Sequence, residues 1–277
     1  MLPLVFSHAN SFPAATYRLL FALLRERGCE VRAVERFGHD PAYPVTDNWP
    51  HLVQQLADFT RAEVERLGEP VFLVGHSLGG FLSVMAAALH PELARGVLLI
   101  DSPLISGWRA NALGMAKRTQ LVGSVSPGKI SRRRRHQWAS NDEALDYFRA
   151  KKAFAQWHPA MLQDYVEHGL ADHDGQRVLG FDREVETAIY NTLPHHLDTL
   201  LRRHPLRCPA AFIGGRGSQE MKQVGMDMTL RITQGRSMIL DGSHLFPMER
   251  PEATAAAIEA SLLNLLSVIA GEHRLNR

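Results

Sequence analysis

The sequence has little of what marks secreted, membrane-spanning or nucleic-acid-binding proteins. Its 277 residues include only two cysteines, Cys29 and Cys208, which are too few for a disulfide-stapled secreted scaffold and typical of a reducing compartment. Lysine and arginine number 31 against 29 aspartates and glutamates, and a net charge of +2 is too small to indicate nucleic acid or an anionic membrane as the main partner. With 45% hydrophobic and 22% charged residues, the composition excludes long-range disorder.

Long uninterrupted apolar runs are also missing. The first ten residues, MLPLVFSHAN, have no basic segment and no apolar core long enough for a secretory signal. The most apolar later stretch, Ala255–Ala270, contains Glu259 and Asn264, whereas a membrane span needs about 20 nearly uninterrupted apolar residues. This stretch is typical of an amphipathic helix docked on the protein. We therefore expect no membrane span and a cytoplasmic location.

Apolar, strand-like runs alternate with helical patterns near both ends of the sequence. The predicted strands are Leu2–Phe6, Val31–Val34, Pro70–Val74, Gly96–Ile100, Ala210–Ile213 and Ser237–Leu240. The predicted helices are Thr16–Arg27, Leu52–Leu67, Leu78–Leu89 and a last one from Glu252 onward. Near-continuous apolar strands separated by helices predict an α/β fold, with a mostly parallel, twisted sheet covered by helices on both faces.

The pattern changes between Pro103 and Pro194. Strand-like runs vanish there, tryptophan and tyrosine become frequent, and helices such as Asn141–Trp157 dominate. Because a typical domain has roughly 150 residues, a chain of 277 predicts one large domain or one domain with an insertion. We expect residues 1–102 and 195–277 to form one α/β domain, and residues 103–194 to form an inserted helical cap.

The segment Gly75-His-Ser-Leu-Gly79 carries the strongest chemical signal. It follows a predicted buried strand directly and opens a helix, which is the context in which G-x-S-x-G marks a nucleophile. So tight a turn forces its central residue into strained dihedral angles, and its neighbours must lack a β-carbon. The turn raises the hydroxyl of Ser77 to the carboxyl edge of the sheet, where α/β proteins bind ligands. Ser77 is therefore the predicted nucleophile.

His244 is the predicted base among 14 histidines. A serine hydroxyl is a poor nucleophile until a base within hydrogen-bond reach takes its proton. His244 lies just after the predicted strand Ser237–Leu240 and before the last helix, so it belongs to the same edge of the sheet as Ser77.

These motifs resemble those of the α/β-hydrolase fold superfamily, in its esterase and lipase-like branch with a serine nucleophile. The matching segments lie at the start, middle and end of the chain; they are Ser7–Asn10, Gly75–Gly80, Gly242–His244 and Glu249–Glu252. The resemblance implies the α/β-hydrolase fold, with a variable helical cap in the inserted segment. It also implies that the backbone N–H groups of Asn10 and Leu78 form the oxyanion hole.

The acid departs from the pattern of that family. The resemblance implies an aspartate after the strand that precedes the histidine loop, but Ser218 occupies this position. Two substitutes remain open. Asp101 ends the strand after the nucleophile helix, where members resembling haloalkane dehalogenases place their acid. Glu220 is the alternative, two residues past Ser218 and with a longer reach.

Other polar clusters have ordinary explanations. The run Ser131–His136, with its four consecutive arginines, is typical of a solvated cap surface in a chain of balanced charge. Neither His168–Asp174 nor the pair His195–His196 has a spacing that places three metal ligands on one face. We therefore expect no metal and no cofactor.

Together these features predict a cofactor-independent serine hydrolase that cleaves a small-molecule carboxylic ester. Ser77 attacks the ester carbonyl with His244 as general base and forms an acyl-enzyme, and Asp101 orients and charge-stabilises the imidazole. His8, His76 and Trp108 are candidates for lining the substrate pocket.

Several alternatives remain open. A thioesterase, a lactonase or a C–C bond hydrolase uses the same machinery and differs only in its pocket. A non-catalytic ligand sensor on a hydrolase scaffold is the alternative from another class, because the acid position is not standard. An epoxide hydrolase or dehalogenase is disfavoured, since those enzymes need a carboxylate in place of Ser77. The sequence does not determine the oligomeric state and is compatible with a homodimer.

Overall fold

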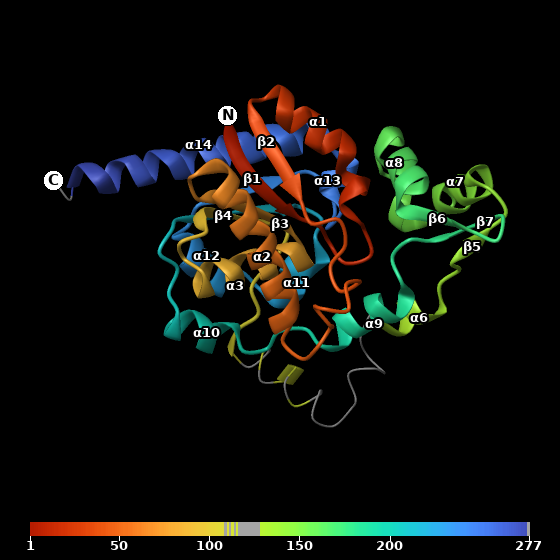
Figure 1. Ribbon diagram of the computed structural model, residues 1–277, viewed down its shortest axis with the longest axis horizontal. Coiled ribbons are helices and arrows are strands. Elements are labelled where there is room, and N and C mark those ends of the chain that lie inside the picture. Colours follow the sequence, from red (N-terminus) through yellow and green to blue (C-terminus); the bar gives the residue numbers. More distant parts are fainter. Residues whose placement is uncertain (108–109, 111, 114, 116–127, 276–277) are drawn as a thin grey trace.

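A six-stranded parallel sheet forms the centre of the structure (Figure 1). The computed structural model describes residues 1–107, 110, 112–113, 115 and 128–275. In spatial order the strands are β2 (Cys29–Ala33), β1 (Leu2–Ser7), β3 (Val71–His76), β4 (Ala94–Ile100), β8 (Ala210–Gly215) and β9 (Ser237–Leu240). Every neighbouring pair is parallel. Each predicted strand overlaps an observed one, so the predicted mostly parallel sheet is confirmed.

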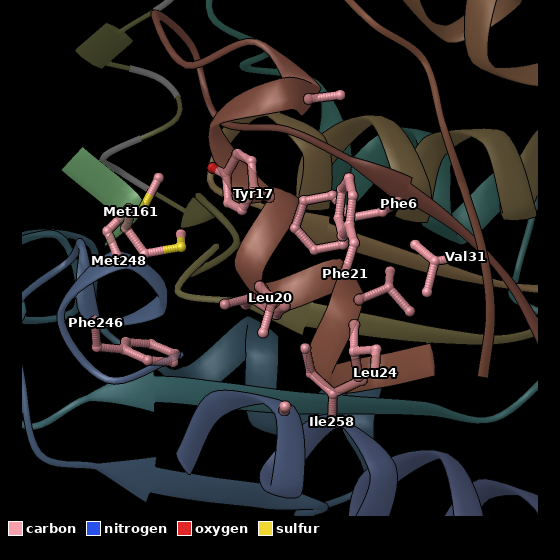
Figure 2. Close-up of a cluster of buried hydrophobic side chains, with 14 of the residues drawn as sticks. Phe6, Tyr17, Leu20, Phe21, Leu24, Val31, Met161, Phe246, Met248 and Ile258 are labelled. Carbon is pink, nitrogen blue, oxygen red and sulfur yellow. The ribbon is translucent and has the colours of Figure 1, made fainter. Parts of the chain in front are cut away.

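Helices cover both faces of this sheet, as a parallel sheet buried on two sides requires. The helices of the α/β part are α1 (Arg18–Glu26) with the preceding 3₁₀ turn η1 (Ala14–Tyr17), α2 (Pro50–Leu67), α3 (Leu78–Leu89), α10 (Leu197–Arg203), α11 (Gln219–Val224), α12 (Asp227–Thr233), α13 (Phe246–Glu249) and α14 (Pro251–Leu275). Side chains alternate along β1: Leu4 and Phe6 join a buried cluster with α1 and α14, whereas Val5 joins one with α2 and α3. Figure 2 shows the first cluster, in which Phe6 lies close to Phe21 of α1.

Helix α14 is docked on the sheet along its first half. By length and composition alone, Pro251–Gly271 is long and apolar enough to cross a membrane, with a mean hydropathy of 1.7. Its buried apolar residues pack into the core, and four of them recur at helical spacing; these four are Ala255, Ile258, Leu262 and Leu265. The predicted docked helix is therefore confirmed, although its C-terminal end extends beyond the body of the molecule (Figure 1).

The segment between β4 and β8 contains strands as well as helices. The prediction that strands vanish there is therefore wrong. It contains α6 (Gly128–Arg133), β5 (Gln137–Trp138), α7 (Asn141–Arg149), η2 (Lys152–Phe154), α8 (Pro159–Gly169), β6 (Leu170–His173), β7 (Gln176–Leu179) and α9 (Arg183–Asn191). The three strands pair antiparallel in the order β5-β7-β6. Asp174 and Gly175 join β6 to β7 with φ angles of 49° and 76°. An Asp-Gly pair with two positive φ angles is a signature of a two-residue hairpin turn, and this signal was overlooked in a segment with few apolar residues.

Helix α8 attaches the inserted segment to the α/β part. It packs against η1 and α1, and Met161 of α8 lies beside Met248 of α13 in Figure 2. The backbone N–H of His158, at the start of α8, donates a hydrogen bond to the carbonyl of Met248 at 2.8 Å. The inserted segment is thereby fixed next to the loop that carries His244.

Candidate active site

Ser77 occupies a strained turn between β3 and α3. Its φ and ψ are 53° and −115°, outside the regions that side chains other than glycine normally adopt. A β-carbon on Gly75 would lie 2.1 Å from the carbonyl oxygen of Gly79, and one on Gly79 would lie 1.9 Å from that of Ser7. Both positions therefore require glycine, as the sequence pattern predicts, because backbone atoms cannot move aside.

Three side chains that are far apart in the sequence meet at this turn. The Ser77 hydroxyl donates to Nε2 of His244 at 3.0 Å, and Nδ1 of His244 donates to Oδ2 of Asp101 at 2.6 Å. Asp101 follows β4 and is fully buried, and His244 lies in the loop after β9. Since β3, β4, β8 and β9 are parallel, all three residues lie at the carboxyl edge of the sheet.

Asp101, and not Glu220, makes the hydrogen bond to the imidazole. The Glu220 carboxylate lies 3.7 Å from Nδ1 of His244. Asp101 is fixed by two further donors: the backbone N–H of Gly215 at 2.7 Å from Oδ1, and the hydroxyl of Ser218 at 2.6 Å from Oδ2. The serine in the expected acidic position thus donates a hydrogen bond to the acid that replaces it. The sequence gives no signal for this contact, because Asp101 and Ser218 are 117 positions apart.

The surroundings of His244 raise its pKa. Burial alone would lower the pKa of this imidazole, because a charged ring is poorly solvated there. The hydrogen bond to Asp101 and the negative charges of Glu220 and Asp101 outweigh burial, so the net shift is upward. Glu220 therefore affects the proton affinity of His244 without accepting its hydrogen bond.

The reactivity of Ser77 toward an activated ester should rise with pH through a midpoint above 6.5, the ordinary pKa of histidine. Protonated His244 cannot accept the Ser77 proton, so Ser77 should be unreactive below the pKa of His244 and reactive above it. In Glu220→Gln, one negative charge that favours the imidazolium is lost, and the midpoint should move to lower pH. The measurement is kcat/KM against pH. A wild-type midpoint below 6.5, or a variant midpoint that is unchanged or higher, would contradict this assignment.

His8 and His76 do not line the substrate pocket, which corrects the prediction for both. Each is fully buried, and its two ring nitrogens are used by the protein itself. Nε2 of His8 accepts the N–H of Phe37 at 3.1 Å, and its Nδ1 donates to the carbonyl of Ala9 at 2.8 Å. Burial lowers the pKa of His8 to about 4 and that of His76 well below the usual range, so both rings are neutral. The third candidate, Trp108, lies outside the described residues.

His76 instead supports the loop of the predicted base. The backbone N–H of Ala9 donates to the Tyr17 hydroxyl at 3.2 Å, and that hydroxyl lies 2.8 Å from Nδ1 of His76. Because the Tyr17 oxygen already accepts one hydrogen bond, its proton points to His76. Nε2 of His76 then carries the ring proton and donates to the carbonyl of His244 at 2.9 Å. This series of hydrogen bonds links the turn after β1 to the loop after β9.

Tyr17→Phe tests this series. The substitution leaves the buried N–H of Ala9 and Nδ1 of His76 without their partner, which should reduce the free energy of unfolding by about 1–3 kcal/mol. Urea unfolding of the variant measures the change. Tyr147→Phe is the matched control: within the described residues the Tyr147 hydroxyl has no hydrogen-bond partner, and we expect a change within about 0.5 kcal/mol. Equal effects of the two substitutions would contradict the series.

A cavity of about 640 Å³ opens beside Ser77 and His244. Asn10 forms part of its wall, and within the described part of the chain its backbone N–H makes no hydrogen bond. Its side-chain amide donates to the carbonyl of Glu186 at 3.1 Å, which holds the turn after β1 in place. Leu78 is the first residue of α3, where backbone N–H groups are free because no preceding turn accepts them.

The charged groups beside Ser77 are arranged for a hydrogen bond and not for a metal ion. The ligand atoms of Asp101, Glu220 and His244 lie within 4.8 Å of one another. However, Nδ1 of His244 is only 2.6 Å from Oδ2 of Asp101. Donor atoms that share one ion at bond lengths of about 2.0–2.2 Å lie roughly 3 Å or more apart.

Comparison with known proteins decides the family. The model of the Alpha/beta hydrolase family matches residues 4–257. The chain belongs to the α/β hydrolase family. Among curated proteins, this α/β hydrolase is 24% identical over 274 residues to a serine hydrolase-like protein of Dictyostelium discoideum, covering 87% of this chain and 69% of that protein. The expected fold and family are thereby confirmed.

Solved structures share the fold of this α/β hydrolase. An E-2-(acetamidomethylene)succinate hydrolase aligns with a TM-score of 0.70 at 22% identity, covering 94% of this chain and 91% of that one. An esterase of M. tuberculosis aligns with a TM-score of 0.66 at 20% identity, covering 94% and 85%. At these identities the likeness shows the fold alone. The family match and the curated relative make the chain a hydrolase of the α/β-hydrolase family.

Proposed function

We propose that this α/β hydrolase cleaves a carboxylic ester through an acyl-enzyme on Ser77. The observation that carries the proposal is the continuous series of hydrogen bonds from Ser77 through His244 to buried Asp101, at the wall of a cavity of about 640 Å³. A hydroxyl, an imidazole and a carboxylate in this order are the parts that activate a serine.

In the first half of the reaction, Oγ of Ser77 bonds to the ester carbonyl carbon while Nε2 of His244 takes the hydroxyl proton. The backbone N–H groups of Asn10 and Leu78 stabilise the tetrahedral oxyanion. The carbonyl re-forms as the ester C–O bond breaks, and the leaving alcohol takes its proton from His244. Asp101 stays ionised and stabilises the imidazolium during both proton transfers.

In the second half, His244 takes a proton from water, whose oxygen attacks the acyl carbon. Collapse of this second intermediate releases the carboxylic acid and returns the proton to Ser77. A serine nucleophile argues against epoxide hydrolysis, which needs a carboxylate at this position. A thioester, a lactone or a C–C bond can enter the same sequence of steps, and the cavity decides among these substrates.

The test combines a covalent probe with a series of substrates. A fluorophosphonate should label the protein at Ser77, as mapped by mass spectrometry of its peptides, and p-nitrophenyl esters of increasing acyl length should be hydrolysed. An unlabelled protein without esterase activity would support the ligand-sensor alternative. Labelling at a different serine would refute the assignment of Ser77.

We also propose that residues 103–194 act as a cap that sets the acyl or alcohol preference. Five consecutive residues of this segment, 152–156, line the cavity that contains Ser77. We assign the enzyme to the cytoplasm, which is consistent with the free thiols of Cys29 and Cys208. Fractionation of cells expressing the tagged protein tests that location.

A further inference from the structure

A second cavity, of about 670 Å³, lies in the inserted segment and is rich in cations and aromatic rings. Its lining residues are Arg133, Arg134, Arg135, Tyr147, Phe148, Lys151, Ala153 and Phe154. No acidic side chain of the described residues lines it. Three of its lining residues, Arg134, Ala153 and Phe154, also line the cavity that contains Ser77. We call this second cavity the basic cavity.

Two of the four cations in the basic cavity are not neutralised. Arg135 pairs with Glu143 at 2.5 Å, and Arg134 pairs with Glu186 at 3.0 Å. Arg133 and Lys151 are exposed and have no carboxylate within ion-pair distance in the described part of the chain. A concave surface with uncompensated positive charge attracts an anion that can reach both cations.

Aromatic rings form the rest of the wall. Nζ of Lys151 lies 4.5 Å from the centre of the Tyr147 ring, and the Arg135 guanidinium lies 5.4 Å from the same centre. The rings of Phe148 and Phe154 contact each other, with centres 4.9 Å apart. A ligand in this cavity therefore contacts cations and, next to them, the flat faces of aromatic rings. A nucleobase or an apolar linker of the ligand can stack on these faces.

Arg134 connects the two cavities. Its side chain is only 21% exposed, held by the ion pair with buried Glu186. The run of four arginines is thus not a uniformly solvated surface, which corrects the interpretation of the sequence. One arginine is anchored in the protein, while its neighbours Arg133 and Arg135 face the basic cavity.

We propose that the basic cavity binds a phosphate group on the tail of the substrate. The proposal rests on the function proposed for Ser77 and names its substrate class: an ester or thioester whose leaving group carries phosphate at some distance from the carbonyl. Phosphate carries a charge of about −1.5 to −2 at neutral pH and has three acceptor oxygens. It can therefore engage Arg133 and Lys151 together, whereas a single carboxylate supplies only one charge.

Binding without turnover tests the cavity independently of Ser77. Titration calorimetry with ADP and with pyrophosphate should show binding that weakens about tenfold in Arg133→Ala and again in Lys151→Ala. Arg132→Ala is the matched control, because Arg132 belongs to the same run but pairs with Glu184 and does not line the cavity. Binding should also weaken as the ionic strength rises from about 0.05 to about 0.5 M.

The two probes identify the source of the phosphate. If ADP binds more tightly than pyrophosphate, the aromatic rings of the cavity bind the nucleoside part of a nucleotide. If the two bind equally, the cavity recognises the phosphate group alone. Absence of binding, or equal losses in Arg132→Ala and Arg133→Ala, would overturn the proposal. Binding of phosphatidylglycerol vesicles in place of both soluble probes would also overturn it, and would assign the cations to a lipid surface.

Kinetics then connect the cavity to Ser77. With acetyl-CoA as the phosphate-bearing thioester, Arg133→Ala and Lys151→Ala should each raise KM about tenfold and leave kcat nearly unchanged. The same variants should hydrolyse p-nitrophenyl acetate, which has no phosphate, at the wild-type rate. ADP binding in a protein that hydrolyses neither substrate would refute the function of Ser77 and retain the cavity. Hydrolysis of p-nitrophenyl acetate with no effect of either variant on acetyl-CoA would refute the proposed substrate class.

Discussion

Replacing Ser77 by alanine should reduce kcat for p-nitrophenyl acetate about 10⁴- to 10⁶-fold and abolish labelling by a fluorophosphonate. The substitution removes the hydroxyl that donates a hydrogen bond to Nε2 of His244 at 3.0 Å. The residual rate should come from the amides of Asn10 and Leu78 and from binding alone. Steady-state kinetics and mass spectrometry measure the two effects.

Unfolding measurements should separate this loss from a loss of structure. The backbone at position 77 keeps a φ of 53° with either serine or alanine, so its strain is the same in both proteins. We therefore expect the free energy of unfolding to change by less than about 1 kcal/mol. Ser83→Ala is the matched control, because Ser83 is buried in α3, the helix that follows Ser77, and does not line the cavity. Its activity and labelling should remain near wild type. More than about one per cent of wild-type turnover in Ser77→Ala would rule out Ser77 as the nucleophile.

Asp101→Asn should lower kcat by about 10³- to 10⁴-fold. An asparagine cannot stabilise the imidazolium. Its amide nitrogen also favours the tautomer of His244 that carries its proton on Nε2, which cannot accept the proton of Ser77. With its oxygen toward the backbone N–H of Gly215, the amide nitrogen faces Nδ1 of His244 and the hydroxyl of Ser218, so it donates where the carboxylate accepts. The measurement is kcat at a pH above the pKa of His244.

Glu220→Gln is the companion variant, since Glu220 is the other carboxylate near His244. We expect it to change kcat less than about threefold at that pH, because its carboxylate is 3.7 Å from Nδ1 and affects only the proton affinity of the ring. If Glu220→Gln lowered kcat as much as Asp101→Asn did, the acid would have been assigned to the wrong residue.

The local part of the site follows from short stretches of sequence. Gly75 is required because the carbonyl of Gly79, four residues later, occupies the space that a β-carbon would fill, whereas at Gly79 that space is occupied by the carbonyl of Ser7 on the neighbouring strand. The alternation of apolar strands and helices follows from burial on two faces of a parallel sheet. The hairpin at Asp174-Gly175 carries an equally local signal, and it was missed because few apolar residues flank it.

Other parts of the site depend on distances that no short stretch contains. His76 is predicted to line the substrate pocket, yet its ring hydrogen-bonds to Tyr17 and to the carbonyl of His244. The direction of a side chain at a strand end depends on which strands lie beside it. The sequence alone does not give that order.

Periodicity and the G-x-S-x-G pattern of one tight turn are enough to predict the α/β class and to place Ser77 and the loop of His244 at one edge of the sheet, because these signals are read within a few residues of the chain. The tertiary structure alone chose Asp101 over Glu220. It also brought Arg133 and Lys151 to the lining of one cavity and paired Arg134 with Glu186. These contacts join residues separated by up to 143 positions, as in His244 and Asp101, so they exist only after the strand order has brought them within a few ångströms.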